Sequence, residues 1–311
     1  MANERYLVYQ PNHGIGVELA MVHHAARLAR VLDRTVVLPL LPILETQQYQ
    51  GGIDEYFDMP ERLNWISTRE FCEEHGGQIG RLFALEPQWQ REYRSKVSRE
   101  RHPVWLDNIR RHPYFELAGM QLDKVTRQAI TGSLNASEVQ KIFGTDDRTI
   151  GFSYHHSLLE GYSTYEEPYR DPWWRDDVPP QPRWEFFEAV RLALGDRPAL
   201  AMHVRRGSLD NARVIDGVEL PALAAFEEHI RPGPGLAYLA TDTAEVHAQF
   251  RKIRPGIRQI ETGHFTRDAV LDLCACVLAN RFVGTDYSTF TQYILHARTS
   301  LGRPRDSAVL L

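Results

Sequence analysis

Cysteine is scarce in this sequence, and the three that occur follow no framework. Cys72, Cys274 and Cys276 are an odd number and lack metal-ligand spacing, which disfavours both a disulfide scaffold and a zinc site. Cys274 and Cys276 stand two residues apart in an apparent helix, so we expect them on different faces. Such sparse cysteine fits a reducing compartment best.

Long apolar runs and an excess of positive charge are also missing. No run reaches the roughly 18–20 residues that cross a bilayer, and the first residues lack the charged and apolar segments of a secretory signal. We therefore expect a cytoplasmic protein without a membrane span. With 36 basic and 41 acidic side chains the net charge is −5, so nucleic acid is not an expected partner and any anion site must be local.

What the chain does have is a repeated alternation of strand-like and helix-like segments, over a length that suits two domains. The first half opens with the strand, glycine turn, helix and strand of a βαβ unit, at 5–10, 11–16, 17–32 and 35–38. Residues 43–148 are expected to form helices and loops, with a helix at 68–75, before a strand at 149–154.

The second half repeats strand and helix more regularly. Strands are expected at 199–204, 236–240, 257–261 and 281–284, and helices at 184–194, 220–229, 244–252, 266–279 and 290–297. The aromatic and proline-rich segment 160–183 indicates an ordered connection or part of an acceptor-binding face. The fold class predicted is α/β, with two doubly wound domains at 1–165 and 184–311 that face each other across a cleft.

Chemistry is expected where the strands of the second domain end. An apolar strand runs directly into His203-Val-Arg205-Arg206-Gly207. The planar donors of arginine fit phosphate oxygens in pairs, and a glycine lets backbone and ligand approach closely. The alternative is a surface arginine pair that follows a strand.

Two further turns, at 241–243 and 285–289, follow parallel strands and therefore share the same edge of the sheet. Asp242 can accept hydrogen bonds from ribose hydroxyls or base N–H groups. Ser288 and Thr289 add hydroxyls and backbone N–H donors for a diphosphate at a helix N-terminus. Each turn is also what an ordinary helix N-cap looks like. The sequence has no Gly-x-Gly-x-x-Gly and no Walker lysine, which disfavours an ordinary dinucleotide or P-loop site.

Taken together, these segments resemble the GDP-fucose-dependent fucosyltransferase superfamily, and within it most of all the protein O-fucosyltransferases. The similarity is spread over most of the chain, and the order and spacing of its pieces are fairly specific. The segments that carry it are 6–9, 14–16, 26–39, 53–58, 66–71, 203–207, 238–242 and 282–291.

The resemblance implies a GT-B-like arrangement of two Rossmann-like domains, an acceptor-side domain and a donor-binding domain, with no metal ion or other cofactor required. Arg205 would contact the β-phosphate of the donor and stabilise the departing diphosphate. The other donor-binding residues are expected to be Gly14, Gly16, His203, Gly207, Asp242, Asp286, Ser288, Thr289 and Phe290.

One departure from the family pattern concerns catalysis. The glycine loop of the family usually continues Gly-Asn-Gln, whereas this chain has Gly16-Val17-Glu18. Since valine has no hydrogen-bonding side chain, the role of the asparagine is lost or moved. Glu18 and His13 are the candidate general bases that join Arg205 in the catalytic set. The alternatives are a solvated glutamate in the first helical turn and a plain loop histidine.

The function expected is an inverting, metal-independent transfer of a sugar, fucose by resemblance, from a GDP-sugar to an acceptor hydroxyl on a protein, glycan or small molecule. Three alternatives remain open. One is a different GDP-hexose with a glycan or metabolite acceptor, and another is a GDP-sugar-binding protein without transferase activity. The third, a sulfotransferase-like enzyme, fits poorly because the first strand is not followed by its phosphate-binding loop.

Overall fold

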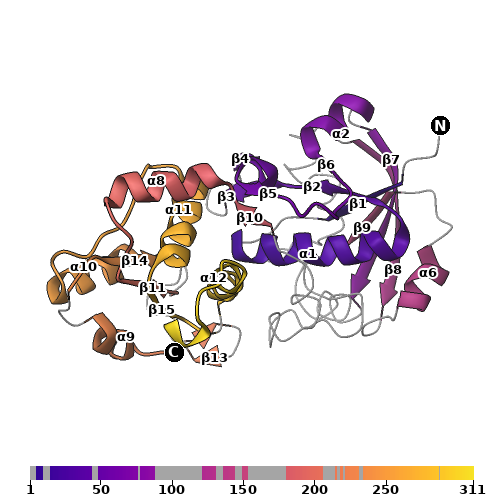
Figure 1. Ribbon diagram of the computed structural model, residues 1–311. Helices are drawn as coiled ribbons and strands as arrows, with labels where there is room; N and C mark the ends of the chain where they lie inside the picture. The colour runs from indigo at the N-terminus through magenta and orange to yellow at the C-terminus, as the bar shows by residue number, and fades with distance from the viewer. Residues whose placement is uncertain are drawn as a thin grey trace. The chain divides into compact units, whose positions relative to one another are not determined.

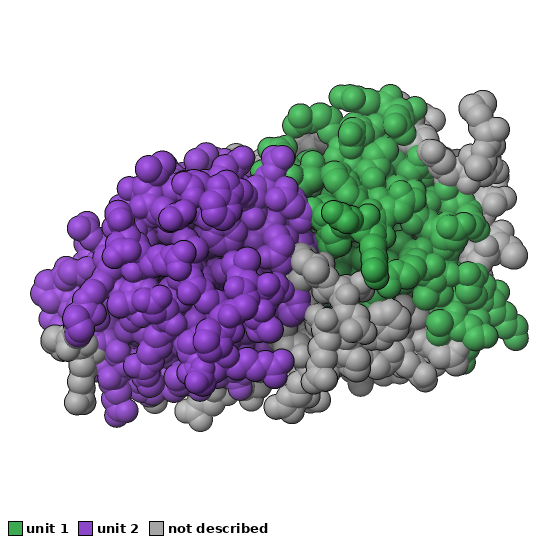
Figure 2. All heavy atoms as spheres, in the orientation of Figure 1, with its two compact units in different colours: residues 1–14, 18–55, 59–173 green, residues 15–17, 56–58, 174–311 purple. Residues whose placement is uncertain are grey.

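The computed structural model describes residues 5–9, 15–43, 48–75, 78–87, 121–130, 136–143, 149–152, 180–205, 214–215, 218–219, 221–230, 234–286 and 288–311. The chain divides into two compact units (Figure 2). Unit 1 comprises residues 1–14, 18–55 and 59–173, and unit 2 comprises 15–17, 56–58 and 174–311. Unit 2 therefore includes two short segments that the predicted boundaries leave in the first domain. None of the described helices combines the length and apolar character needed to cross a membrane.

Unit 1 is built on a six-stranded parallel sheet of order β6-β2-β1-β9-β7-β8 (Figure 1). Its strands are β1 (Tyr6–Tyr9), β2 (Thr35–Leu38), β6 (Trp65–Ser67), β7 (Gln78–Pro87), β8 (Gln121–Ile130) and β9 (Thr149–Phe152). The predicted βαβ unit is present as β1, α1 (Ile15–Leu32) and β2, whose register pairs Tyr6 with Thr35.

The expectation of helices and loops over residues 43–148 is wrong in part. The stretch contains the two ten-residue strands β7 and β8, which pair in parallel with each other. The two strands lie far apart in the sequence, and their conformation depends on pairing with each other. A reading of either segment alone therefore gives little indication of a strand. The predicted helix is confirmed as α2 (Thr68–His75). The remaining elements are β3 (Leu40–Ile43), β4 (Gln48–Gly52), η1 (Ile53–Glu55), β5 (Phe57–Asp58) and α6 (Ala136–Phe143).

Unit 2 has a four-stranded parallel sheet of order β14-β11-β15-β16. Its strands are β11 (Leu200–Val204), β14 (Ala237–Thr241), β15 (Arg281–Gly284) and β16 (Ala308–Leu310). Its helices are α8 (Trp184–Leu194), α9 (Leu223–Ile230), α10 (Ala244–Ile253), α11 (Phe265–Leu278) and α12 (Thr289–Ser300). Short elements are β10 (Gln181–Pro182), which pairs with β5, and β12 (Val214–Ile215), β13 (Val218–Glu219) and η2 (Arg305–Ser307). Two parallel sheets with helices confirm the predicted α/β class.

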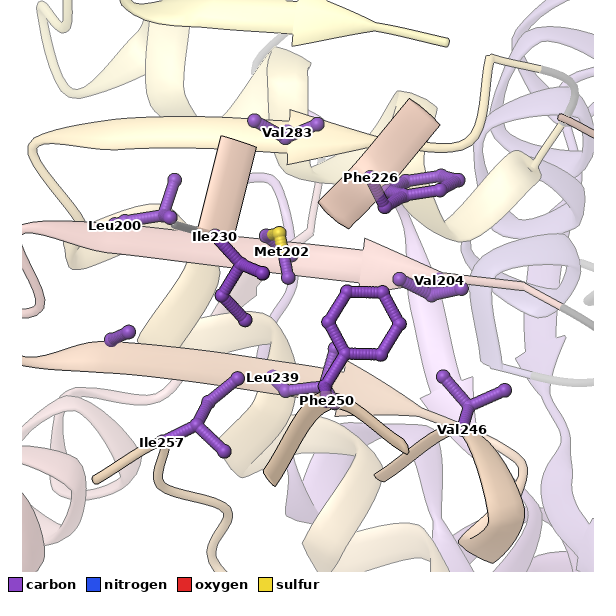
Figure 3. Packing of buried hydrophobic residues seen from close by; sticks show 11 residues of the cluster. Leu200, Met202, Val204, Phe226, Ile230, Leu239, Val246, Phe250, Ile257 and Val283 are labelled. Carbon is purple, nitrogen blue, oxygen red and sulfur yellow. The ribbon is translucent and has the colours of Figure 1, made fainter. Parts of the chain in front are cut away.

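Strand β11 lies at the centre of the core of unit 2 and is buried at all five positions. One face, carrying Leu200, Met202 and Val204, packs against α9 and α10 (Figure 3). On the other face, His203 contacts α12 through Thr291. This burial on both faces is what a continuous apolar run predicts for a central parallel strand.

Two predictions about the second half need correction. Residues 257–261 do not form a strand, because only Arg258 bridges to β14, at Tyr238. The Ile260 N–H donates to the Tyr238 hydroxyl at 3.2 Å instead of to a main-chain carbonyl of the strand. The sheet also gains β16 at the C-terminus, which the sequence pattern did not predict.

The Tyr238 hydroxyl connects this segment to a half-buried carboxyl group on α11. It donates to Asp272 Oδ1 at 2.6 Å. Burial, aided by the nearby charges of Asp268 and Glu261, raises the pKa of Asp272 to about 8 despite the opposing hydrogen bond from Tyr238. The carboxyl therefore remains protonated in the folded protein at pH values where it is ionised in the unfolded chain.

This pKa predicts a pH dependence of stability. Because the folded pKa is the higher one, the stabilisation is fully present below about pH 4 and is lost as pH rises through about 8. Between pH 5 and pH 8 we expect the wild type to lose stability at about 1.4 kcal/mol per pH unit. Over the same range the Asp272→Asn variant should lose a few kcal/mol less. Urea unfolding of both proteins at the two pH values checks this. Parallel pH profiles would contradict it.

Candidate functional site

Three turns meet at the carboxyl edge of the sheet in unit 2, as the sequence predicts. Strands β11, β14 and β15 run parallel and end at Val204, Thr241 and Gly284. The residues that follow them are in contact, since the Arg205 side chain reaches Asp242 and its N–H reaches Thr285 Oγ1. The edge therefore assembles residues that lie 37 and 80 positions apart in the chain.

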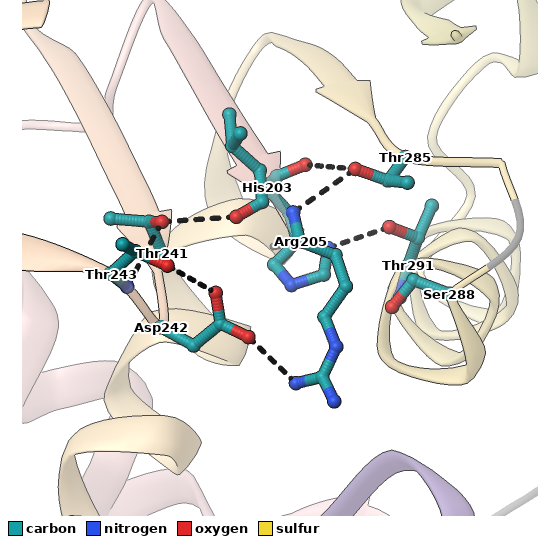
Figure 4. Close-up of polar contacts among 9 residues, drawn as sticks. His203, Arg205, Thr241, Asp242, Thr243, Thr285, Ser288 and Thr291 are labelled. Atoms are coloured by element: carbon teal, nitrogen blue, oxygen red, sulfur yellow. Dashed lines mark hydrogen bonds and ion pairs between the residues drawn. The ribbon is translucent and has the colours of Figure 1, made fainter. Parts of the chain in front are cut away.

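Arg205 and Asp242 form an ion pair at this edge (Figure 4). Arg205 Nη1 lies 2.8 Å from Asp242 Oδ2, and the two side chains are 46% and 28% exposed. Thr243 donates its hydroxyl to the other carboxylate oxygen at 3.1 Å. The guanidinium has five N–H donors in a fixed plane, and its bond to Asp242 orients that plane. Partial exposure leaves the pair accessible to a ligand.

Two threonine hydroxyls form hydrogen bonds between the ends of neighbouring strands. Thr285 Oγ1 accepts from the Arg205 N–H at 3.1 Å and donates to the His203 carbonyl at 3.3 Å. Thr241 Oγ1 donates to the Val204 carbonyl at 3.0 Å. The sequence alone indicated no separate role for Thr285. Its signal in the sequence was the Thr-Asp pair that stands at the end of both β14 and β15.

The capping alternative holds for one turn and fails for the other. Thr243 is the N-cap of α10, but its side chain makes no capping hydrogen bond. The polar side chains of that turn instead bond to Asp242 and to β11. Ser288, in contrast, is the N-cap of α12 and accepts from the Thr291 N–H at 3.5 Å. Asp286 lies beside this cap, where Gln292 Nε2 donates to its carbonyl oxygen at 2.6 Å and to Oδ1 at 3.2 Å.

His203 is buried between the arginine and helix α12. Burial lowers the pKa of its imidazole to about 3, while Asp242 raises that pKa and Arg205 lowers it. The ring centroid of Phe290 lies 4.8 Å from that of His203, and the rings are inclined at 45°. A neutral, fixed imidazole thus accompanies the guanidinium at this edge.

Gly16 connects the start of α1 to the start of α12. A Cβ at Gly16 would lie 2.6 Å from the Phe290 nitrogen and 2.9 Å from the Thr289 carbonyl carbon, so no larger residue fits without movement. Residues 15–17 are grouped with unit 2, as is α12. The glycine therefore brings two helix N-termini together, and helix N-termini favour anions.

Glu18 is buried, with 1% exposure. The alternative of a solvated glutamate is therefore wrong. His13, Gly14 and Gly207, which complete the predicted set, lie outside the described residues, as does Arg206.

The described segments contain no group of three or more histidine, cysteine or acidic side chains that could hold a metal ion. Cys274 and Cys276 are free thiols, both buried in α11, and burial raises the pKa of each. Cys72 is also free.

The fold matches solved structures, whereas no family model and no curated protein matches the sequence. POFUT1, a protein O-fucosyltransferase, in complex with GDP-fucose gives a TM-score of 0.66 at 14% identity, covering 100% of this chain and 98% of that one. POFUT1 in complex with GDP gives 0.66 at 16% identity, covering 100% and 99%. The fucosyltransferase NodZ from Bradyrhizobium gives 0.45 at 15% identity, covering 94% and 92%, a score that supports no inference. The chain has the fold of a protein O-fucosyltransferase, as the sequence resemblance predicts.

Proposed function

We propose that this protein is a glycosyltransferase that moves fucose from GDP-fucose to an acceptor hydroxyl. The observation that carries the proposal is the Arg205–Asp242 ion pair, in which Nη1 and Oδ2 are 2.8 Å apart. The pair is partly exposed and lies at the carboxyl edge of a parallel sheet. Ligands of open α/β sheets bind outside this edge. Support comes from the full-length match in fold to POFUT1, solved in complex with GDP-fucose.

We further propose a GT-B organisation in which unit 2 binds the donor and unit 1 contributes to the acceptor side. Each unit contains a parallel sheet, which is the architecture that such an organisation requires. In unit 2, Asp242 would contact the nucleoside, and the start of α12 at Ser288, Thr289 and Phe290 would contact the diphosphate together with Gly16. The acceptor is a hydroxyl on a protein, a glycan or a small molecule.

The proposed reaction is a single displacement with inversion at the anomeric carbon. The acceptor oxygen forms a bond to that carbon as the bond to the β-phosphate oxygen breaks, and the acceptor proton passes to a general base. Negative charge develops on the leaving GDP. Arg205 would stabilise it through charge-assisted hydrogen bonds, which is the role that a metal ion fills in other transferases, so no metal is required in this proposal.

Glu18 and His13 remain the proposed general bases. We expect Glu18→Gln to reduce turnover by about 100-fold or more, the contribution typical of a general base, with unchanged affinity for GDP. Glu61→Gln, at an exposed site in unit 1, is the matched control and should leave turnover unchanged. Wild-type turnover in Glu18→Gln would assign Glu18 a structural role and leave His13 as the base.

The donor is tested by calorimetric titration of the purified protein with GDP, UDP, ADP and GDP-fucose, in the absence of metal. Micromolar binding of GDP and GDP-fucose, but not of UDP or ADP, would support the proposed donor class. Binding to all three nucleotides alike, or to none, would contradict it. GDP binding without turnover over a panel of acceptors would favour a GDP-sugar-binding protein, the possibility raised by Val17.

A further inference from the structure

His203 is held on two sides by residues of α12. Its Nδ1 lies 2.7 Å from Thr291 Oγ1, and the Phe290 ring packs against the imidazole. Thr291 is fully buried. In Figure 4 a dashed line joins the imidazole to the Thr291 hydroxyl. The ring therefore has little freedom to rotate about its bond to the backbone.

The close approach of Thr291 depends on Gly284. This glycine is the register partner of His203 on β15. A Cβ at Gly284 would lie 2.6 Å from Thr291 Cγ2 and 2.8 Å from the Phe282 ring. Residues in register on neighbouring strands project from the same face of a sheet. Because Gly284 has no side chain, Thr291 can come close enough to bond to the His203 imidazole.

We propose that Thr291 is a positioning residue that fixes His203 as a neutral imidazole with its proton on Nε2. A buried hydroxyl hydrogen needs an acceptor. Within the part of the chain that the structure describes, Nδ1 of His203 is the one hydrogen-bond partner of the Thr291 hydroxyl. The hydroxyl therefore donates to Nδ1, and a neutral ring whose Nδ1 accepts carries its hydrogen on Nε2.

This tautomer decides what His203 can do. An Nε2–H group donates to an acceptor-only partner, such as a phosphate oxygen of a nucleoside diphosphate. A metal ligand or a general base needs the Nε2 lone pair, so His203 is excluded from both roles. Arg205 and His203 then form a pair of donors, one charged and one neutral. Only the identity of the ligand rests on the proposed function, since the tautomer is a property of the protein alone.

The tautomer is measured by long-range ¹H–¹⁵N correlation spectra of protein labelled with ¹⁵N-histidine, without ligand. The His203 signals are assigned by their absence in His203→Gln. We expect a neutral ring with an unprotonated Nδ1 and a protonated Nε2. A His203 ring protonated at Nδ1, or at both nitrogens at neutral pH, overturns the proposal without any variant at Thr291.

Two variants test the role of the hydroxyl. Thr291→Val preserves shape, so we expect it to fold, to show both neutral tautomers in exchange and to bind GDP about threefold to tenfold more weakly, the value of one hydrogen bond. Thr291→Ser should restore the wild-type spectrum and affinity. A wild-type spectrum and affinity in Thr291→Val would overturn the proposal. If the wild type does not bind GDP, the proposed function fails while the spectra still decide the tautomer.

Discussion

Replacement of Arg205 by alanine is expected to reduce sugar transfer by about 100- to 1000-fold. Without the guanidinium, the negative charge that develops on the departing diphosphate loses a positioned donor. GDP affinity should fall by about 10- to 100-fold, because a hydrogen bond to a charged group contributes about 1.5–3 kcal/mol. Steady-state transfer assays and calorimetric titration with GDP measure the two effects.

The fold should survive this substitution. The half-exposed ion pair with Asp242 adds little to stability, and the Arg205 N–H keeps its bond to Thr285 Oγ1. Arg305→Ala is the matched control, since this exposed arginine precedes β16 and lies toward the opposite edge of the parallel sheet. Normal turnover in Arg205→Ala would remove Arg205 from the donor site, and a comparable loss in Arg305→Ala would indicate an unspecific effect of charge.

The proximity of Arg205 to Asp242 was predictable because it follows from topology. Each residue comes directly after an apolar strand, and parallel strands separated by helices must end at one edge of the sheet. The sequence therefore indicated that side chains 37 positions apart would meet. It could not indicate that Asp242 would bind the guanidinium directly, because the distance between the two residues and the direction of their side chains depend on the register of the strands.

The threonines were harder to assign. Thr285 and Thr291 stand beside a helix start, where hydroxyl side chains are common for reasons of capping alone. Neither residue caps α12, because Ser288 does. They belong to the site because they contact His203, which lies 82 and 88 positions away in the chain, and local patterns do not contain such contacts. The same reason explains why the pairing of β7 with β8 was missed.

Glu18 shows a different kind of error. A glutamate in the first turn of a helix is ordinarily solvated and favoured by the helix dipole, which made the exposed alternative plausible. Helix α1, however, is buried on nearly all sides, and His23, His24 and Arg27 are buried with Glu18. Burial lowers the pKa of His24 to about 3, with Arg27 acting in the same direction. No pattern in the sequence of α1 predicted that tertiary packing would bury these polar residues.

The largest expected effect on stability comes from Arg298, on α12, which the sequence did not single out. Its guanidinium is buried and stays charged, although burial lowers its pKa to about 10. Nη1 donates to the carbonyls of Cys276, Val277 and Ala279 at 3.0, 3.2 and 2.6 Å, and Nη2 donates to the Asn280 carbonyl and to Ser307 Oγ at 3.2 and 2.8 Å.

These bonds satisfy carbonyl groups at the end of α11 that no intrahelical donor can reach. A positive charge at a helix C-terminus also interacts favourably with the helix dipole. One side chain thus joins α11, the turn into β15, and the segment before β16. Because β15 carries Gly284 and Thr285 into the candidate site, Arg298 supports the site from the interior of unit 2 without being part of it.

We expect Arg298→Met to lower the free energy of unfolding by about 3–5 kcal/mol, because methionine fills the space but leaves several buried carbonyls without a donor. Arg303→Met is the graded control. Within the described residues the Arg303 side chain donates one bond, to the Leu278 carbonyl at 2.9 Å, so its loss should cost about 1 kcal/mol. Urea unfolding gives both values.

Affinity for GDP separates support of the fold from a direct role in the site. At temperatures where Arg298→Met remains folded, its affinity for GDP should equal that of the wild type, because the bonds that Arg298 makes within the described residues go to main-chain carbonyls and Ser307. Equal stability losses in the Arg298 and Arg303 variants would contradict the argument from hydrogen-bond number. Arg298→Lys should fall between wild type and Arg298→Met, since an ammonium group cannot span the same set of acceptors as the planar guanidinium.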